Sequence, residues 1–148
     1  AMNHDKRIYE AWFDGSTSPH IRKSGIGGIV ISPENKIIAK YSLEVPYVYD
    51  YRVVEYQSLI KLIEVLHKCG IKNVEIKTDC LGLCDSIKYG RSNRFNKLVP
   101  GNEVTRLHQE AIYALNSLGY YMIKWVPRKK NKKADRLSKK YSERKLKV

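Results

Sequence analysis

The sequence predicts an α/β domain in which a five-stranded mixed sheet carries helices on both faces. Three observations support this. The first third of the 148-residue chain holds three strand patterns and no helical one, helical and strand patterns then alternate, and no internal repeat or domain linker interrupts them. The order β-β-β-α-β-α-α-β-α makes the first three strands an antiparallel meander. Right-handed crossovers then place the last two strands parallel to the first.

The three strands of the meander are expected at Arg7–Phe13, Gly25–Ser32 and Lys36–Leu43. Each run is rich in apolar and β-branched residues, as half-buried strands are. Between the second and third runs stands Ser32-Pro33-Glu34-Asn35, which is typical of a tight turn. A two-strand hairpin with a short loop therefore follows the first strand.

The rest of the chain alternates between helical and extended patterns. A helix is expected from Tyr51 to Cys69, with Gly70 at the position that favours a left-handed backbone after a helix. The later elements are a strand at Val74–Thr78, a short helix at Cys80–Lys88 closed by Gly90, a basic loop at Arg91–Pro100, a helix at Asn102–Leu118, a strand at Tyr120–Val126 and a terminal helix at Lys132–Arg144.

The chain is strongly basic, with 28 Lys and Arg against 15 Asp and Glu and a net charge of +13. Residues 124–148 hold twelve of the basic residues and two acids, so this segment alone carries +10 of that charge. A basic stripe of this kind indicates a nucleic-acid phosphate backbone as partner, the alternative being a solubilising surface. A membrane-surface helix is disfavoured because the segment has no continuous apolar face.

The remaining composition predicts a reduced, cytoplasmic monomer. Three cysteines, at 69, 80 and 84, have neither paired spacing nor an even number, and Cys80 and Cys84 are expected to be small buried hydrophobes. No apolar stretch approaches the roughly 18 residues of a membrane span. Ala1-Met2 is typical of a remnant of an expression tag, so the domain is expected at residues 3–148.

Four acids stand at the ends of predicted elements or on an apolar helix face, not among the predicted solvent-facing residues. Asp14 and Asp79 each end a predicted strand, and Asp135 falls in the first turn of the terminal helix. Carboxyl ends of parallel strands meet at one sheet edge, where α/β proteins build their sites. Each acid also has a plain structural interpretation: a turn for Asp14, and a capping or helix-end role for Asp79 and Asp135.

Glu55 lies on the apolar side of the first predicted helix. It shares a helical stripe with Leu59, Leu62 and Leu66, so its side chain is expected to face the sheet. An ionised carboxylate there is unfavourable unless it is ion-paired, for example with a lysine, or bound to metal. Gathered with the other three acids, it would form an oxygen-lined site for divalent cations.

Five motifs follow one another along the chain: F-D-G-S at Phe13–Ser16, G-I-G-G-I-V at Gly25–Val30, V-E-Y-Q-S-L at Val54–Leu59, K-T-D-C at Lys77–Cys80 and V-P-R-K-K-N-K-K-A-D-R-L-S at Val126–Ser138. In this order they resemble the ribonuclease H family, and the resemblance covers nearly the whole chain. The last motif and the short loop at 91–100 resemble the compact branch of the family, which lacks the basic handle helix.

The resemblance implies an enzyme with four catalytic, metal-binding carboxylates: Asp14, Glu55, Asp79 and Asp135. Two Mg²⁺ ions, or Mn²⁺ as a substitute, would be held there, with Asp14 bridging them. Asp135 would complete the site of the ion that activates water, and Glu55 and Asp79 would hold the ion at the leaving oxygen. The expected reaction is hydrolysis of the RNA strand of RNA/DNA hybrids, leaving a 5′-phosphate and a 3′-hydroxyl.

Several expected nucleic-acid contacts depart from the family pattern. His20 and Arg22 stand where members often have Asn-Pro-Gly, Tyr51 and Arg52 replace two asparagines that touch 2′-hydroxyls, and Arg128 stands near a common histidine. These changes affect hybrid specificity more than cleavage. The full set of expected contacts is Ser16, His20, Arg22, Tyr51, Arg52, Arg91, Arg94, Arg128, Lys129, Lys130 and Asn131.

Other functions remain open from the sequence. The same fold serves nucleases for double-stranded RNA or DNA junctions, and a transposase-like enzyme would use an acid near Glu103–Glu110 in place of Asp135. A catalytically silent nucleic-acid-binding module is the non-enzymatic alternative. Trp12 and Trp125 are expected in the core rather than as base-stacking platforms.

Overall fold

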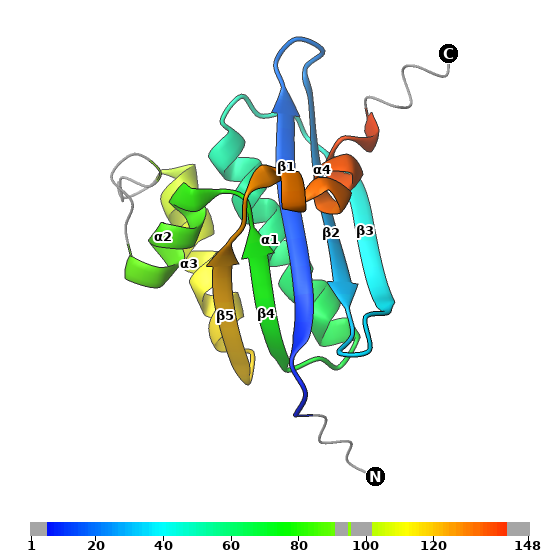
Figure 1. Cartoon of the computed structure of the whole chain (residues 1–148). Helices are drawn as coiled ribbons and strands as arrows, with labels where there is room; N and C mark the ends of the chain where they lie inside the picture. The colour runs from blue at the N-terminus through cyan, green and yellow to red at the C-terminus, as the bar shows by residue number, and fades with distance from the viewer. Residues whose placement is uncertain (1–5, 91–94, 96–101, 142–148) are drawn as a thin grey trace.

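A single five-stranded sheet organises the chain (Figure 1). The structure is a computed structural model and describes residues 6–90, 95 and 102–141. The strands are β1 (Tyr9–Ser18), β2 (Lys23–Ile31), β3 (Ile37–Val45), β4 (Asn73–Thr78) and β5 (Tyr120–Trp125). Their order across the sheet is β3-β2-β1-β4-β5, with β3, β2 and β1 antiparallel and β4 and β5 parallel to β1. The predicted mixed sheet is confirmed.

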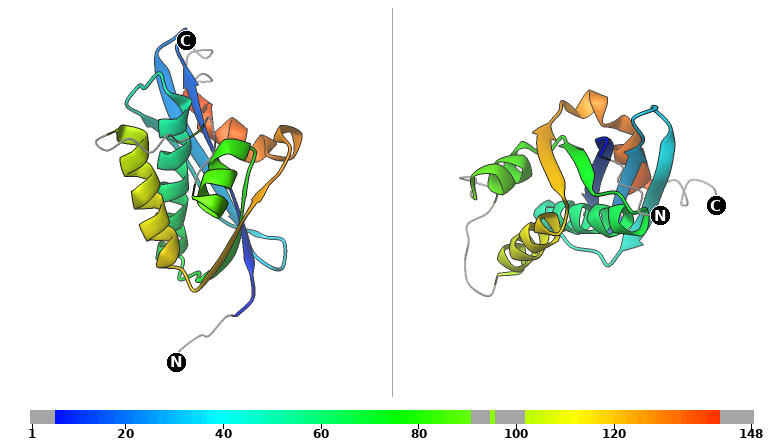
Figure 2. Two further views of the ribbon diagram at one scale, coloured as in Figure 1. Left: turned by 90° about the vertical axis from the view of Figure 1, so that its left-hand side faces the viewer. Right: turned by 90° about the horizontal axis from the view of Figure 1, so that it is seen from below.

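Helices cover both faces of this sheet, as predicted. They are α1 (Tyr51–Lys68), α2 (Leu81–Tyr89), α3 (Glu103–Asn116) and α4 (Lys132–Ser138), with a single 3₁₀ turn, η1 (Arg128–Lys130), before α4. Figure 2 shows α1 and α3 together on one face and α4 on the other. α2 packs beside β5 at the sheet edge. No helix within the described part of the chain is long and apolar enough to cross a membrane.

The main core lies between α1, α3 and the sheet. Leu59, Leu62 and Leu66 of α1 are fully buried against Phe13 of β1 and Ile76 of β4. The stripe that predicted the inward face of α1 is therefore correct. The helix ends where expected, because Gly70 takes a φ of 70°, which L-residues with a side chain adopt rarely.

Two glycines of β2 allow α4 to lie directly on the sheet. A Cβ at Gly27 would overlap the backbone of Leu137 and Ser138, and a Cβ at Gly25 would overlap Ser138 and the ring of Tyr141. The Ser16 hydroxyl, on β1, donates a 2.9 Å hydrogen bond to the Ser138 carbonyl. The glycine-rich stretch thus fixes the height of α4 above β1 and β2.

Two boundaries differ from the prediction by more than two residues. β1 continues to Ser18 instead of ending at Phe13, because β2 keeps pairing with it antiparallel and sets Asp14 opposite Gly27. The parallel pairing with β4 does end early, at Trp12 opposite Lys77, so Asp14 still lies just past the last parallel pair. α4 ends at Ser138, where Lys139 leaves helical geometry with a φ of −111°; positions 142–144 of the predicted helix lie outside the described residues.

We expect Gly27→Ala to destabilise the fold by about 2–4 kcal/mol, because the new methyl group meets backbone that cannot rotate away. Gly90→Ala is the matched control. Gly90 has a φ of 76° but open space around its Cβ position, so only backbone strain of about 1 kcal/mol is expected there. Urea denaturation of the two variants measures the difference, and equal losses would contradict the packing account.

Candidate active site

A cavity of about 380 Å³ opens at the sheet edge where the predicted acids meet. β1, the first turn of α1, the end of β4 and the start of α4 each contribute to it. Its lining residues are Asp14, Gly15, Ser16, Thr17, Tyr51, Glu55, Asp79, Cys80, Arg128, Asp135 and Lys139. All four predicted carboxylates therefore line one cavity, although they come from four separate elements.

Three of the carboxylates form a tight cluster. One oxygen each of Asp14, Glu55 and Asp79 lies within 4.8 Å of the others. Asp14 and Glu55 are buried, and Gly15 donates its backbone N–H to Glu55 Oε1 at 2.6 Å. Hard divalent cations prefer such carboxylate oxygens, and the donor set fits Mg²⁺ or Mn²⁺. The structural interpretation of these acids as isolated turns and caps does not explain this convergence.

Asp135 completes the cavity from the α4 side. It lies outside the tight cluster but close enough to Asp14 to raise the pKa of that carboxyl. Lys139 Nζ lies 3.0 Å from Asp135 Oδ1, and the Arg128 guanidinium lies 3.8 Å from the same oxygen. Two cations thus hold the outermost acid, while the inner three have none at ion-pair distance among the described residues.

The electrostatics of the cluster reflect crowding of like charges. Burial, followed by the charges of Glu55 and Asp79, raises the pKa of Asp14 to about 10. Burial also raises the pKa of Glu55 to about 7, against the Gly15 hydrogen bond that lowers it, and burial raises the pKa of Asp79. For Asp135, burial alone would raise the pKa, but the contacts with Lys139 and Asp14 lower it. A bound divalent cation would relieve this repulsion.

Two side chains position Asp79 from behind. Asn131 is only 1 % exposed, and its Nδ2 donates to the Phe13 carbonyl at 3.0 Å and to Asp79 Oδ2 at 3.4 Å. The Trp125 indole N–H donates to the Asp79 carbonyl at 3.1 Å. Asn131, predicted to contact nucleic acid, is thus a buried side chain whose nitrogen holds Asp79, and Trp125 is 48 % exposed instead of lying in the core.

The other expected nucleic-acid contacts spread around the cavity. Ser16, Tyr51 and Arg128 line it, although the Ser16 hydroxyl already bonds to Ser138 and contacts Tyr141. Lys129 and Lys130 are exposed on η1 beside it. Arg91 and Arg94 lie outside the described residues.

Three further positions lie away from the acids. His20 and Arg22 are in the β1–β2 turn, where the Arg22 guanidinium stacks 4.9 Å from the Tyr47 ring. Arg52 is held by Asp50, at 2.6 Å, and by the Phe95 carbonyl, at 2.8 Å. Its guanidinium therefore ties the start of α1 to Phe95, which lies between α2 and α3.

Four cavity residues were not among the predicted site residues: Gly15, Thr17, Cys80 and Lys139. Lys139 lies one helical turn after Asp135, and an (i, i+4) acid–base pair was the signal available for it. Cys80 follows Asp79 directly, and its half-buried thiol lies beside Glu55, whose charge together with burial raises the pKa of the thiol. Cys84 is buried as predicted.

The transposase-like alternative does not match this geometry. Glu103 and Glu110 lie on α3, on the face of the sheet opposite α4, and both pair with Arg106 at 2.7 and 3.0 Å. Neither lines the cavity, whereas Asp135 does.

The profile of the family described as reverse transcriptase-like matches residues 12–141, which is most of the chain. The chain belongs to the ribonuclease H family. Solved structures of the family agree: ribonuclease H1 from the halophilic archaeon Halobacterium salinarum NRC-1 superposes with a TM-score of 0.81 at 19% identity, covering 93% of this chain and 98% of that one. The N-terminal ribonuclease H domain of a Mycobacterium tuberculosis protein gives 0.78 at 20%, covering 90% and 98%.

A third structure carries a ligand. The metagenomic LC11 ribonuclease H1 from compost, solved in complex with an RNA/DNA hybrid, superposes with a TM-score of 0.78 at 19% identity and covers 93% of this chain and 99% of its own. At these identities the structures establish the ribonuclease H fold of the chain. Membership in a family of nucleases is carried by the profile over residues 12–141.

Asp14→Asn is expected to stabilise the metal-free protein at alkaline pH. The unfolded chain releases the Asp14 proton near pH 3.8 and the folded chain near pH 10, so the folded state binds more protons in between. The free energy of unfolding therefore falls as pH rises through this window. Removing the charge should raise the free energy of unfolding at pH 8 by roughly 1–3 kcal/mol, which corresponds to one or two pKa units, and by less at pH 4.

Urea denaturation in EDTA at pH 4, 6 and 8 measures this effect. Asp85→Asn on α2, a residue that does not line the cavity, is the matched control and should show no such pH-dependent gain. Added Mg²⁺ should stabilise the wild type more than Asp14→Asn. A variant no more stable than the wild type at pH 8 would refute the crowding of charges around Asp14.

Proposed function

We propose that this protein is a ribonuclease H that hydrolyses the RNA strand of RNA/DNA hybrids with two divalent cations, Mg²⁺ or Mn²⁺, leaving a 5′-phosphate and a 3′-hydroxyl. The observation that carries the proposal is the convergence of the Asp14, Glu55 and Asp79 oxygens within 4.8 Å, with Asp135 beside them. A cluster of raised carboxyl pKa values in an otherwise basic protein is typical of a functional site.

Each carboxylate has a distinct place in this mechanism. Asp14 stands at the centre, between the Glu55–Asp79 side and the Asp135 side of the cavity. When bound, the cations would neutralise the phosphate and supply an activated water for in-line attack. Glu55 is oriented by the Gly15 N–H and Asp79 by Asn131 and Trp125, so these two ligands are held in place before any cation arrives.

The cations around the cavity would hold the nucleic acid. The Arg128 side chain is 76 % exposed and lies 3.8 Å from Asp135, and Lys129 and Lys130 add two exposed positive charges on the same η1 turn. Such side chains contact phosphates and orient the duplex without reading bases. Tyr51 is 53 % exposed at the cavity rim and offers a phenol hydroxyl to a sugar, the group that separates RNA from DNA.

The choice of an RNA/DNA hybrid follows from the relatives. The LC11 ribonuclease H1 and a foamy viral protease–reverse transcriptase were both solved in complex with RNA/DNA hybrid. Because this chain departs from the family at His20, Arg22, Tyr51 and Arg52, double-stranded RNA and DNA junctions belong in the same test. A silent binding module is disfavoured, since four clustered acids would repel a polyanion without any gain.

Asp79→Asn should lower cleavage of a labelled RNA/DNA hybrid by about 10³-fold or more while leaving the fold intact, because Asp79 is an inner-cluster ligand only half buried. Asp85→Asn, the same change on α2 outside the cavity, should cut normally. The assay compares hybrid, double-stranded RNA, double-stranded DNA and a four-way junction, with Mg²⁺ and with EDTA. Cleavage that persists in EDTA or in Asp79→Asn would overturn the proposal.

A further inference from the structure

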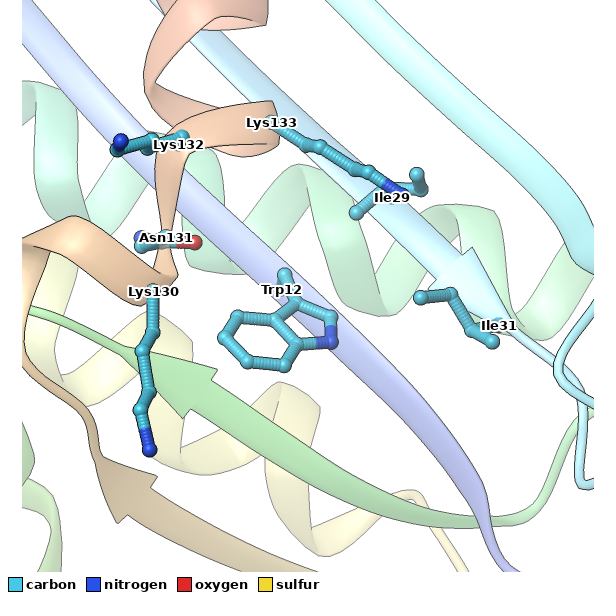
Figure 3. A pocket seen from close by; sticks show the side chains of 7 residues that line it. All are labelled: Trp12, Ile29, Ile31, Lys130, Asn131, Lys132 and Lys133. Atoms are coloured by element: carbon cyan, nitrogen blue, oxygen red, sulfur yellow. The ribbon is translucent and has the colours of Figure 1, made fainter.

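A second cavity, of about 240 Å³, lies on the α4 side of the sheet (Figure 3). Its floor is Trp12 of β1 with Ile29 and Ile31 of β2, and its border is the segment 130–133. Trp12 pairs with Ile29 across the two strands. α4 covers the glycine half of β2 and leaves this isoleucine half to form the cavity, which we call the Trp12 pocket.

Two buried polar atoms at this pocket have no hydrogen-bond partner among the described residues: Trp12 Nε1 and Asn131 Oδ1. The orientation of the Asn131 amide is fixed, because its Nδ2 must donate to the Phe13 carbonyl and to Asp79. Its oxygen is turned toward the Trp12 side in Figure 3. A buried donor and a buried acceptor left unpaired are unfavourable, so the pocket suits a ligand that offers both groups.

The border of the pocket is positively charged. Lys130, Lys132 and Lys133 are exposed at its edge, and Figure 3 shows the Lys133 side chain reaching across toward Ile29. Lys77 lies 4.8 Å from the centre of the Trp12 ring, where Glu10 pairs with it at 3.4 Å. The three border lysines have no acid in the pocket lining, so they favour an anionic ligand.

Size and chemistry together select a nucleotide. The volume is below the roughly 300–1,000 Å³ of sites for drug-sized molecules, so it admits one planar ring system rather than a folded segment. A nucleobase stacks on the face of an indole, its edge can donate to the Asn131 oxygen, and its phosphate would meet the lysines. An acidic peptide would satisfy the lysines but has no planar ring to stack on Trp12 while it donates to Asn131.

The pocket adjoins the active site through one residue. Asn131 faces the pocket with its oxygen and holds Asp79 with its nitrogen. Lys130 likewise belongs to η1, whose first residue, Arg128, lies 3.8 Å from Asp135. A strand bound over the carboxylates would cross η1, whose exposed lysines could hold its phosphates, to reach the pocket.

We propose that the Trp12 pocket holds an unpaired nucleotide of a strand that extends beyond the hybrid bound at the active site. The pocket would make the enzyme prefer hybrids with single-stranded extensions over blunt ones. This inference rests on the proposed function, since it assumes that a hybrid occupies the neighbouring cavity.

The test measures binding, not cleavage, in EDTA so that no strand is cut. Fluorescence anisotropy compares a blunt 12-base-pair hybrid, a length chosen as about one helical turn, with the same hybrid carrying a short extension at each of its four strand ends in turn. We expect one polarity of extension to bind about five-fold or more tightly than the blunt hybrid, as stacking of a base on an aromatic ring allows.

Two variants report on the pocket itself. Trp12→Leu keeps an apolar floor but removes the aromatic ring, and the double variant Lys130→Gln/Lys133→Gln removes two border charges without touching the floor. Both should reduce the preference for the extended hybrid to about two-fold or less. The control Lys68→Gln/Lys72→Gln removes the same charge from exposed positions outside the pocket lining and should keep the preference.

Equal binding of blunt and extended hybrids would overturn the inference, and so would a preference that survives both pocket variants. If the Trp12 variant does not fold, the lysine double variant alone tests whether the pocket causes the preference for the extended hybrid. Cleavage of the blunt hybrid in Mg²⁺ is scored separately. A blunt hybrid that is cut without any extension preference would refute the pocket and leave the nuclease function standing.

Discussion

The contact between α4 and the glycines of β2 is the constraint on which both cavities depend. Because Gly25 and Gly27 carry no side chain, the Leu137–Ser138 backbone lies directly on the sheet. That height sets Asp135 beside Asp14 and lets Asn131 reach both the Phe13 carbonyl and Asp79. Where β2 changes from glycine to Ile29 and Ile31, the start of α4 only borders the sheet, and the Trp12 pocket forms.

The clustered acids destabilise the fold that brings them together. Burial and mutual repulsion raise the pKa values of Asp14, Glu55 and Asp79, so in the absence of cations the folded protein keeps protons that the unfolded chain would release. The apolar face of α1 offsets this, since Leu59, Leu62 and Leu66 are fully buried beneath Glu55. A stable core therefore carries a destabilised site, as is common where function requires clustered charge.

Local sequence patterns were sufficient to predict the helices and strands and to identify the three acids of the inner cluster. The 3.6-residue stripe of α1 aimed Glu55 at the sheet, and Gly70 marked the end of the helix. The predicted end of β1 at Phe13 was wrong. The apolar run ends there, but the strand continues for as long as it pairs with β2.

The positions of three side chains depend on tertiary contacts and were not predicted from the sequence. Asn131 was predicted as a nucleic-acid contact, and the structure shows a buried amide that also holds Asp79 and the Phe13 carbonyl. Trp125 was expected in the core, yet it lies half exposed and holds the Asp79 carbonyl. Lys139 was overlooked in a lysine-rich segment, although it stands four residues after Asp135, and its 3.0 Å contact with that acid shows its place in the site.

Anomalous diffraction from crystals grown with Mn²⁺ tests the central claim most directly, because it places the cations without reference to activity. The account predicts a manganese peak coordinated by Asp14, Glu55 and Asp79, and a second between Asp14 and Asp135 when a hybrid is bound. No anomalous peak within coordination distance of Asp14 at saturating Mn²⁺ would contradict it.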